Sequence, residues 1–205
     1  MADINICVFG DSIVWGAGDP THGGWAEKLK TNLMRRDSSN LCALYNLGIS
    51  ADTTDELLKR FQIEARARKP NILLFGIGIN DACWRRSEKN TLVSKENFRK
   101  NLHQLITWGR ELTPKIAFIG LTRVEEKKVQ PYPGSSSGKS YSNKIIEEYD
   151  QIVREVNKAE KLSYIDLSKE VPITDLTDGL HPNTVGHEKV FRKVKSFLEK
   201  SGWID

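Results

Sequence analysis

The sequence predicts a three-layer α/β/α fold in which helices cover both faces of a parallel sheet. Short apolar segments alternate with longer segments whose apolar residues recur every three or four positions, as strands and amphipathic helices do. Residues 71–77 are apolar almost throughout, which is typical of a parallel strand covered on both faces. Strands that alternate with helices form parallel sheets with right-handed crossovers. We therefore expect a doubly wound sheet of five strands in the order 2-1-3-4-5.

The strands are expected at residues 4–9, 41–47, 71–77, 115–121 and 162–167. Five helices are expected between and after them, because five sets of apolar residues each share one helical face. The sets are Trp25, Leu29 and Leu33; Leu57, Phe61 and Ala65; Phe98, Leu102, Leu105 and Leu112; Ile145, Tyr149, Ile152 and Val156; and Val190, Val194, Phe197 and Leu198.

Two connections in this pattern are long. Residues 82–94 follow the third strand, and residues 122–140, rich in Gly, Ser and Pro, follow the fourth. Both are expected at the edge of the sheet where the carboxyl ends of the strands meet, which is where such sheets bind ligands. Either loop is therefore a candidate to line a substrate site.

Length and composition indicate a single domain over residues 1–205, of which 39% are hydrophobic. No apolar run approaches the ~20 residues that span a bilayer, and the first ten residues lack the basic start of a signal peptide. A cytoplasmic protein without membrane insertion is therefore expected. The net charge is +4, but the basic residues are interspersed with 27 acidic ones. That distribution is typical of a solvated surface, and no nucleic acid partner is expected.

The cysteines and one glycine-rich segment do not indicate a ligand. Three widely spaced cysteines without a C-x-x-C pair favour neither a disulfide framework nor a zinc site. Cys7 and Cys42 lie in apolar segments and are expected in the core, whereas Cys83 lies in a loop and is expected to be more accessible. GSSSGKS, residues 134–140, has three residues between its glycines instead of the four of a phosphate-binding loop, and follows a polar stretch. ATP or GTP binding is therefore not expected.

Four of the predicted strands lead into a hydroxyl, a glycine turn, a carboxamide or an Asp/His pair. The first strand runs into Ser12, the second ends at Gly48, Asn80 follows the third, and Asp178 and His181 follow the fifth. These strand ends meet at one edge of a parallel sheet, so we expect the five residues to lie together.

This set of residues suits acyl transfer. A serine hydroxyl becomes a nucleophile when a base such as histidine takes its proton, and a carboxylate fixes the imidazole tautomer. Asp178 and His181 are three residues apart, so one turn can present both. The backbone N–H groups of Ser12 and Gly48 and the side-chain amide of Asn80 are candidate donors to an oxyanion.

Each residue also has a simpler structural interpretation. Ser12 suits the cap of the next helix, Gly48 a tight turn, and His181 the residue before a helix that begins with proline. Asp52 is expected to cap the second helix. The five candidate residues occur in order along the chain, each after a predicted strand. The structural interpretations would require several independent coincidences, so the catalytic interpretation is favoured.

Four ordered blocks of this sequence resemble those of the SGNH hydrolases, also called GDSL-type esterases and lipases. The chain differs from the common pattern at Ile13, which replaces a leucine, and at Ala51, where many members have glycine. The blocks cover residues 10 to 186 and read GDSIVWG from Gly10, Asn46-Leu47-Gly48 with Ser50 and Thr53, Gly78-Ile79-Asn80-Asp81, and Asp178-Gly179-Leu180-His181-Pro182 with Asn183 and Gly186.

The resemblance implies a flavodoxin-like sheet and hydrolysis of an ester or thioester through an acyl-serine, with no metal and no cofactor. Ser12 would be the nucleophile, Asp178 and His181 would complete a catalytic triad, and Ser12, Gly48 and Asn80 would form the oxyanion hole. Asp11 is expected to organise the turn. Trp15, one turn beyond Ser12, is expected either in a pocket wall or in the core.

The sequence leaves the substrate open among small-molecule esters. No lid rich in large apolar residues is evident, which favours short acyl or acetyl esters over long-chain lipids. A lysophospholipase or thioesterase acting on longer acyl groups is the alternative within the same chemistry. A flavodoxin-like binding module is the alternative from another class, but it leaves Asn80 and the Asp178–His181 pair without a shared role.

Overall fold

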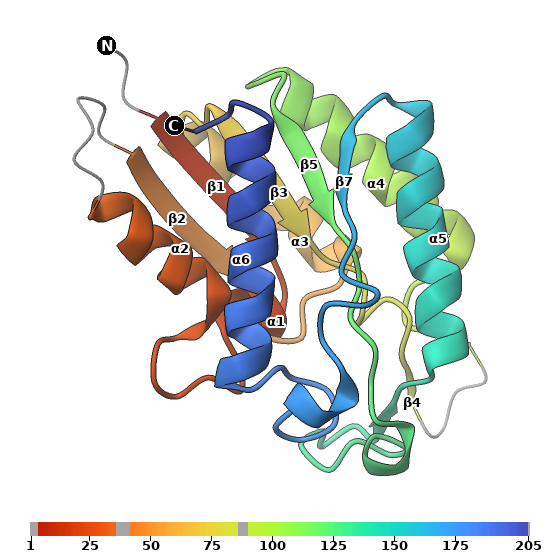
Figure 1. The fold of residues 1–205 in the computed structure, drawn as a ribbon. Helices are drawn as coiled ribbons and strands as arrows, with labels where there is room; N and C mark the ends of the chain where they lie inside the picture. Colours follow the sequence, from red (N-terminus) through yellow and green to blue (C-terminus); the bar gives the residue numbers. More distant parts are fainter. Residues whose placement is uncertain (1–3, 36–41, 86–89, 205) are drawn as a thin grey trace.

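The computed structural model describes residues 4–35, 42–85 and 90–204, and it shows helices on both faces of a parallel sheet (Figure 1). Within these residues the order of the main sheet is β2-β1-β3-β5-β7, and all its strand pairs are parallel. Counted along the chain, this is the expected order 2-1-3-4-5. Leu41, predicted to start the second strand, lies outside the described residues. The strands are β1 (Ile4–Gly10), β2 (Cys42–Gly48), β3 (Ile72–Gly76), β5 (Ile116–Ile119) and β7 (Ser163–Ile165).

The helices divide between the two faces because side chains alternate along each strand. On β1, Ile6 and Val8 pack with α2 and α6, whereas Cys7 and Phe9 pack with α3, α4 and α5. All five expected helices are present, although Leu112 lies beyond the end of its helix. The helices are α1 (Ser12–Trp15), α2 (Gly24–Met34), α3 (Thr54–Arg68), α4 (Lys95–Arg110), α5 (Asn143–Ala159) and α6 (Thr184–Lys200).

The start of α3 differs from the prediction. Thr53, not Asp52, is the N-cap, and it forms a capping box with Glu56, whose carboxylate accepts the Thr53 N–H at 3.2 Å. A threonine followed three residues later by glutamate satisfies two free N–H groups at once. This leaves the Asp52 carboxylate to accept a hydrogen bond from Arg60 Nε at 2.8 Å.

The two long connections are joined by a ribbon that the sequence did not predict. β4 (Trp84–Arg85) pairs antiparallel with β6 (Lys139–Ser140), so residues 82–94 hold part of residues 122–140 in place. Cys83, expected to be accessible, is fully buried in the core on the α3–α5 face. Cys42 was expected in the core but is only half-buried, because β2 is the edge strand of the sheet.

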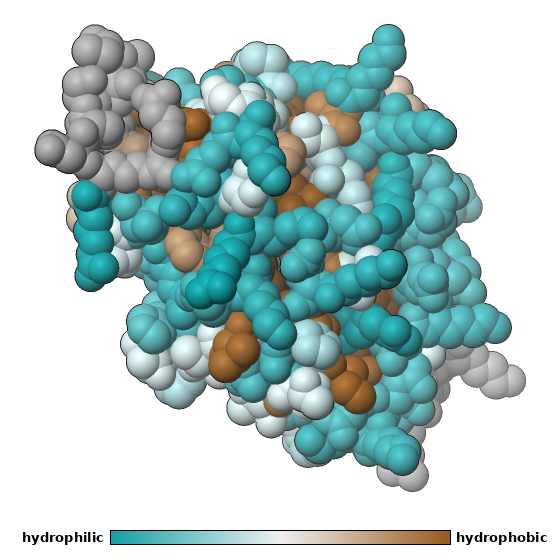
Figure 2. All heavy atoms as spheres, viewed as in Figure 1, coloured by the Kyte–Doolittle hydropathy of each residue, from teal (hydrophilic) through white to brown (hydrophobic). Residues whose placement is uncertain are grey.

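The outer surface over α2 and α6 is mostly hydrophilic, with hydrophobic side chains in small separate spots (Figure 2). Among the described residues, no helix has the length and apolar character needed to cross a membrane.

Candidate active site

Ser12 begins α1 directly after the end of β1. Asp11 is the cap of this short helix, since its side chain accepts a hydrogen bond from the Ile13 N–H at 2.9 Å. The Ser12 hydroxyl is therefore not needed for capping, and its Oγ lies 2.9 Å from His181 Nε2. Gly10 makes this tight junction possible, because a Cβ there would lie 2.3 Å from the Gly76 carbonyl oxygen on β3.

His181 is held by Asp178 from the turn before α6. Asp178 Oδ1 accepts the backbone N–H groups of Leu180 (2.9 Å) and His181 (2.8 Å), and Oδ2 lies 2.7 Å from His181 Nδ1. Burial raises the pKa of Asp178, but the hydrogen bonds from the side chain and backbone of His181 outweigh it and hold this pKa well below its usual range. The ionised carboxylate places the ring proton on Nδ1 and leaves Nε2 to accept a proton from Ser12.

Asn80 is almost fully buried after β3, and three of its four hydrogen-bonding positions are occupied. Its Nδ2 donates to the Asp52 carbonyl oxygen at 3.1 Å. Its Oδ1 accepts from the Tyr141 hydroxyl at 3.1 Å and from Lys139 Nζ at 3.4 Å. These contacts fix which way the amide points and leave one Nδ2 hydrogen for the cavity that Asn80 shares with Ser12.

The two backbone donors expected for an oxyanion differ in this structure. Ser12 is the first residue of α1, so its N–H has no partner inside the helix. The Gly48 N–H donates instead to Asn46 Oδ1 at 3.1 Å. Ser50 and Ala51, just beyond Gly48, line the cavity. Gly48 therefore lies at the expected edge of the sheet, but its N–H is already hydrogen-bonded to Asn46.

Tyr132 touches the site from residues 122–140, and no sequence pattern indicated it. Its hydroxyl donates to Asp178 Oδ2 at 2.8 Å, and its ring meets the His181 ring edge-on at 5.9 Å between centroids. Burial, together with this contact to a carboxylate, raises the pKa of Tyr132 to about 12, so the phenol stays protonated as a donor. No motif marks this tyrosine, because its partner lies 46 residues away.

These groups surround one cavity of about 380 Å³. One side, which we call the motif wall, consists of Ser12, Asn80 and His181, which line the cavity, and of Asp178, which contacts His181 from behind. The other side, the loop wall, consists of residues 132–141, and Tyr132, Gly134, Ser135, Ser136, Ser137, Lys139 and Tyr141 from it line the cavity. No described residue of 82–94 lines the cavity, so this loop supports the loop wall through β4 instead of facing a substrate.

Buried carboxyl groups lie behind the motif wall. Burial raises the pKa of Asp11 and of Asp81 to about 7 in each case, although hydrogen bonds oppose it. Asp81 accepts the Thr54 N–H at 3.0 Å and so ties the end of β3 to the start of α3. Trp15, for which a pocket wall or the core was expected, is 58% exposed and therefore not in the core.

His187 has a structural role. It is fully buried in α6, with Nδ1 accepting the Trp25 N–H at 3.2 Å and Nε2 donating to the Ala17 carbonyl at 2.9 Å. Within the described ranges, no group of three His, Cys, Asp or Glu side chains could hold a metal ion.

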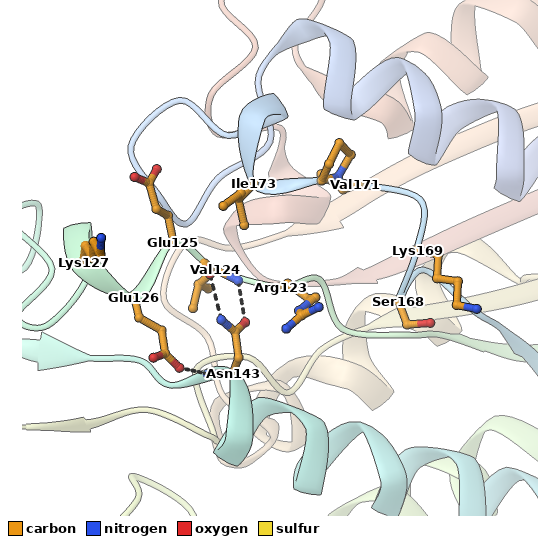
Figure 3. A pocket seen from close by; sticks show the side chains of 11 residues that line it. Arg123, Val124, Glu125, Glu126, Lys127, Asn143, Ser168, Lys169, Val171 and Ile173 are labelled. Atoms are coloured by element: carbon orange, nitrogen blue, oxygen red, sulfur yellow. Dashed lines mark hydrogen bonds between the residues drawn. The ribbon is translucent and has the colours of Figure 1, made fainter.

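A larger hollow of about 730 Å³ lies between the loops after β5 and β7 (Figure 3). Asn143, at the start of α5, lines this hollow. Its Oδ1 accepts the Val124 N–H and its Nδ2 donates to the Val124 carbonyl oxygen, both at 2.9 Å. The lining includes Arg123, Glu125, Lys127 and Lys169 but no residue of the motif wall. The larger hollow contains charged side chains but no nucleophile in contact with a base. The smaller cavity, beside Ser12 and His181, is therefore the better candidate active site.

A doubly wound sheet with a hydroxyl, an imidazole and a carboxylate in contact at its carboxyl edge has the architecture of an α/β serine hydrolase. The chain belongs to the GDSL-like lipase/acylhydrolase family, whose profile matches residues 8–189, and thereby to the SGNH hydrolase superfamily.

Individual relatives agree with this family. The chain is 29% identical over 140 residues to a multidomain esterase of Ruminococcus flavefaciens, a match over 64% of this chain and 16% of that protein. It is 23% identical over 173 residues to an acetylxylan esterase of Geobacillus stearothermophilus, covering 78% of this chain and 73% of the relative. The crystal structure of a lipase/acylhydrolase from Enterococcus faecalis superposes with a TM-score of 0.76 and 27% identity, over 97% of this chain and 96% of that one. The family and its esterase members support an ester hydrolase.

Proposed function

We propose that residues 1–205 form one serine esterase domain in which Ser12 is the nucleophile, His181 the general base and acid, and Asp178 the orienting carboxylate. One observation carries this proposal. A continuous line of contacts runs from Ser12 Oγ to His181 Nε2 (2.9 Å) and from His181 Nδ1 to Asp178 Oδ2 (2.7 Å). Ser12 and His181 meet across 169 positions of the chain, whereas Asp178 and His181 are three residues apart in one turn.

The reaction follows from these contacts. His181 Nε2 takes the proton of Ser12 as Oγ bonds to the ester carbonyl carbon, and the carbonyl oxygen becomes an oxyanion. When the ester C–O bond breaks, His181 gives that proton to the leaving alcohol. Water then attacks the acyl-serine with His181 as base, which releases the acid and restores Ser12.

The oxyanion would be bound by preorganised donors. The Ser12 N–H and the remaining Nδ2 hydrogen of Asn80 are available for this role. Gly48 would be the third donor, exchanging its 3.1 Å bond to Asn46 for the oxyanion. Each such donor typically contributes about 10²–10³ to kcat.

The proposed substrates are acetyl or other short-chain acyl esters. A cavity of about 380 Å³ in which half of the lining residues carry a hydroxyl group supports small, polar substrates over long acyl chains, and an acetylxylan esterase is among the relatives. A series of p-nitrophenyl esters of increasing acyl length tests this. The expected kcat/KM is highest for acetate or propionate, whereas a maximum at eight carbons or more would favour the lysophospholipase or thioesterase alternative.

A serine-reactive fluorophosphonate separates the enzyme from a flavodoxin-like binding module. The expected result is stoichiometric labelling of Ser12, located by peptide mass spectrometry, with loss of ester hydrolysis in parallel. A protein that stays unlabelled under conditions where it is folded would contradict the proposal.

A further inference from the structure

Lys139 brings a positive charge to the candidate active-site cavity. It lies in β6, at the end of the loop wall, and is half-buried. Its backbone is held on both sides, since its N–H donates to Ser135 Oγ at 3.1 Å and its carbonyl accepts the Tyr132 N–H at 2.7 Å. The ammonium group therefore projects from a fixed backbone and not from the free end of a loop.

This charge forms no salt bridge within the described part of the chain, although it opposes the burial that raises the pKa of the Asp11 carboxyl. The contact recorded for Lys139 Nζ is the neutral Asn80 Oδ1 at 3.4 Å, which is long for a hydrogen bond to an ammonium group. The other lysines whose side chains bond within the described residues pair with a carboxylate, as Lys189 does with Asp175 at 2.6 Å. An ammonium group has three N–H donors, so at least two remain for a ligand.

The rest of the cavity is arranged for a polar anion. No carboxylate is among its lining residues, while Ser50, Ser135, Ser136 and Ser137 add hydroxyl groups. Asp178, behind His181, already accepts four hydrogen bonds from Leu180, His181 and Tyr132, and the buried Asp11 caps α1. A half-buried, unpaired ammonium group gains most from a ligand that brings the opposite charge.

We propose that the cavity selects esters whose alcohol portion carries an anionic group, a carboxylate or a phosphate, which pairs with Lys139. This rests on the proposed esterase function and names its substrate class. The alcohol portion is assigned because a short acyl group fills only a small part of a cavity of about 380 Å³. The anion must lie close to the scissile ester, because Lys139 Nζ is 3.4 Å from Asn80, the proposed oxyanion donor.

The test compares 3-acetoxybenzoate with its neutral isostere 3-acetoxybenzamide, and uses 3-acetoxyphenyl phosphate to separate carboxylate from phosphate recognition. The preference is the ratio of kcat/KM for the anionic ester to that for the amide. Because Lys139 also touches Asn80, Lys139→Gln is expected to slow both esters, but the ratio cancels that common effect. We expect the ratio to fall about tenfold in Lys139→Gln and to be largely kept in Lys139→Arg.

Lys127→Gln is the matched control, since it removes the same charge from an exposed residue that lines the other hollow. It is expected to keep the wild-type ratio. Inhibition of the wild-type enzyme by 3-hydroxybenzoate and by 3-hydroxybenzamide tests the same preference without any variant, with the anion expected to bind about tenfold more tightly and less so at high salt.

Equal ratios in wild type and Lys139→Gln, or equal inhibition by the two hydroxy compounds, would overturn the anion proposal while the esterase stands. Failure of the esterase itself has a different signature: neither ester is hydrolysed and the fluorophosphonate leaves Ser12 unlabelled.

Discussion

The two walls of the candidate active site are built in different ways. In the motif wall, the sheet brings Ser12 and His181 together over 169 positions. Short local contacts then orient the side chains: Asp178 binds the N–H groups two and three residues ahead, and Asp11 binds the N–H two residues ahead of it. In the loop wall, the contacts that matter reach across the molecule. Tyr132 meets Asp178 over 46 positions, and Tyr141 meets Asn80 over 61.

This difference separates chemistry from selection. Local motifs reproduce the same hydrogen bonds wherever their few residues occur, so they can carry a reaction common to a family. Long-range contacts depend on one particular loop, so they can differ between proteins without changing the reaction. The motif wall is accordingly expected to set kcat, and the loop wall to set the choice of ester and to hold the motif wall in position.

The most severe way to break the motif wall is Ser12→Ala. Loss of the nucleophile should reduce hydrolysis of p-nitrophenyl acetate by at least about 10³-fold, because His181 then has no serine hydroxyl from which to take a proton. The Oγ carries no cap, so thermal unfolding and circular dichroism should match wild type. Substantial remaining activity would exclude the acyl-serine mechanism.

Asn80→Ala tests a part of the motif wall that is proposed to bind the oxyanion and not to attack the ester. Removing one oxyanion donor should lower kcat by about 10²–10³ with little change in KM, since the donor acts on charge that develops in the transition state. Steady-state kinetics with p-nitrophenyl acetate separates the two parameters. An effect confined to KM would remove Asn80 from the oxyanion hole and leave it as a structural link to Asp52.

Asp11→Asn sharpens the comparison, because the Asp11 side chain caps α1 and so supports the motif wall. Burial raises the pKa of Asp11 to about 7, so between about pH 4 and 7 the native state keeps a proton that the unfolded chain has released. Its contribution to stability is then greatest at low pH and declines as pH rises through 7. The unfolding free energy of the variant minus that of wild type should therefore increase by about 2 kcal/mol from pH 5 to pH 8.

Urea denaturation at the two pH values measures this difference, and asparagine can still cap α1 through its Oδ1. Asp55→Asn, at an exposed position in α3, is the control and should show no such change. A difference between variant and wild type that is the same at both pH values would rule out a protonated Asp11.

Tyr132→Phe is expected to have the smallest effect, and it tests whether the loop wall positions the motif wall. Loss of one hydrogen bond to Asp178 should lower kcat about three- to tenfold. The effect should disappear in an Asp178→Asn background, because the two residues act through one contact. Tyr141→Phe is the counterpart for Asn80, and its effect should disappear in Asn80→Ala.

The control combines each tyrosine variant with the motif-wall residue that it does not contact. Tyr132→Phe should keep its full effect on kcat when combined with Asn80→Ala. If the effects of both tyrosine variants were simply additive with every motif-wall substitution, the loop wall would be a structural cover without a positioning role.

The sequence predicted the parts of the molecule that short patterns encode. The strand order followed from the alternation of strands and helices, and Ser12, Asn80, Asp178 and His181 followed from their places at strand ends. Tyr132 and Lys139 could not be found in this way, because their partners depend on how a long connection folds back. β4 and β6 have two residues each, too few for a hydrophobic period.

The wrong expectations have equally local causes. Asp52 and Thr53 are both good caps, and the choice of Thr53 depended on Glu56 lying three residues later. Cys83 was placed by its loop context, whereas the ribbon behind it closes over the core.

The β4–β6 ribbon has a consequence for redesign of this scaffold. Its two short strands come from different crossovers of the sheet, after β3 and after β5. A graft that exchanges only residues 122–140 would therefore leave Trp84 and Arg85 facing a foreign backbone. Transplanting residues 82–94 and 122–140 together would keep β4 paired with β6. A library of such paired loops would vary substrate specificity without changing the residues of the motif wall.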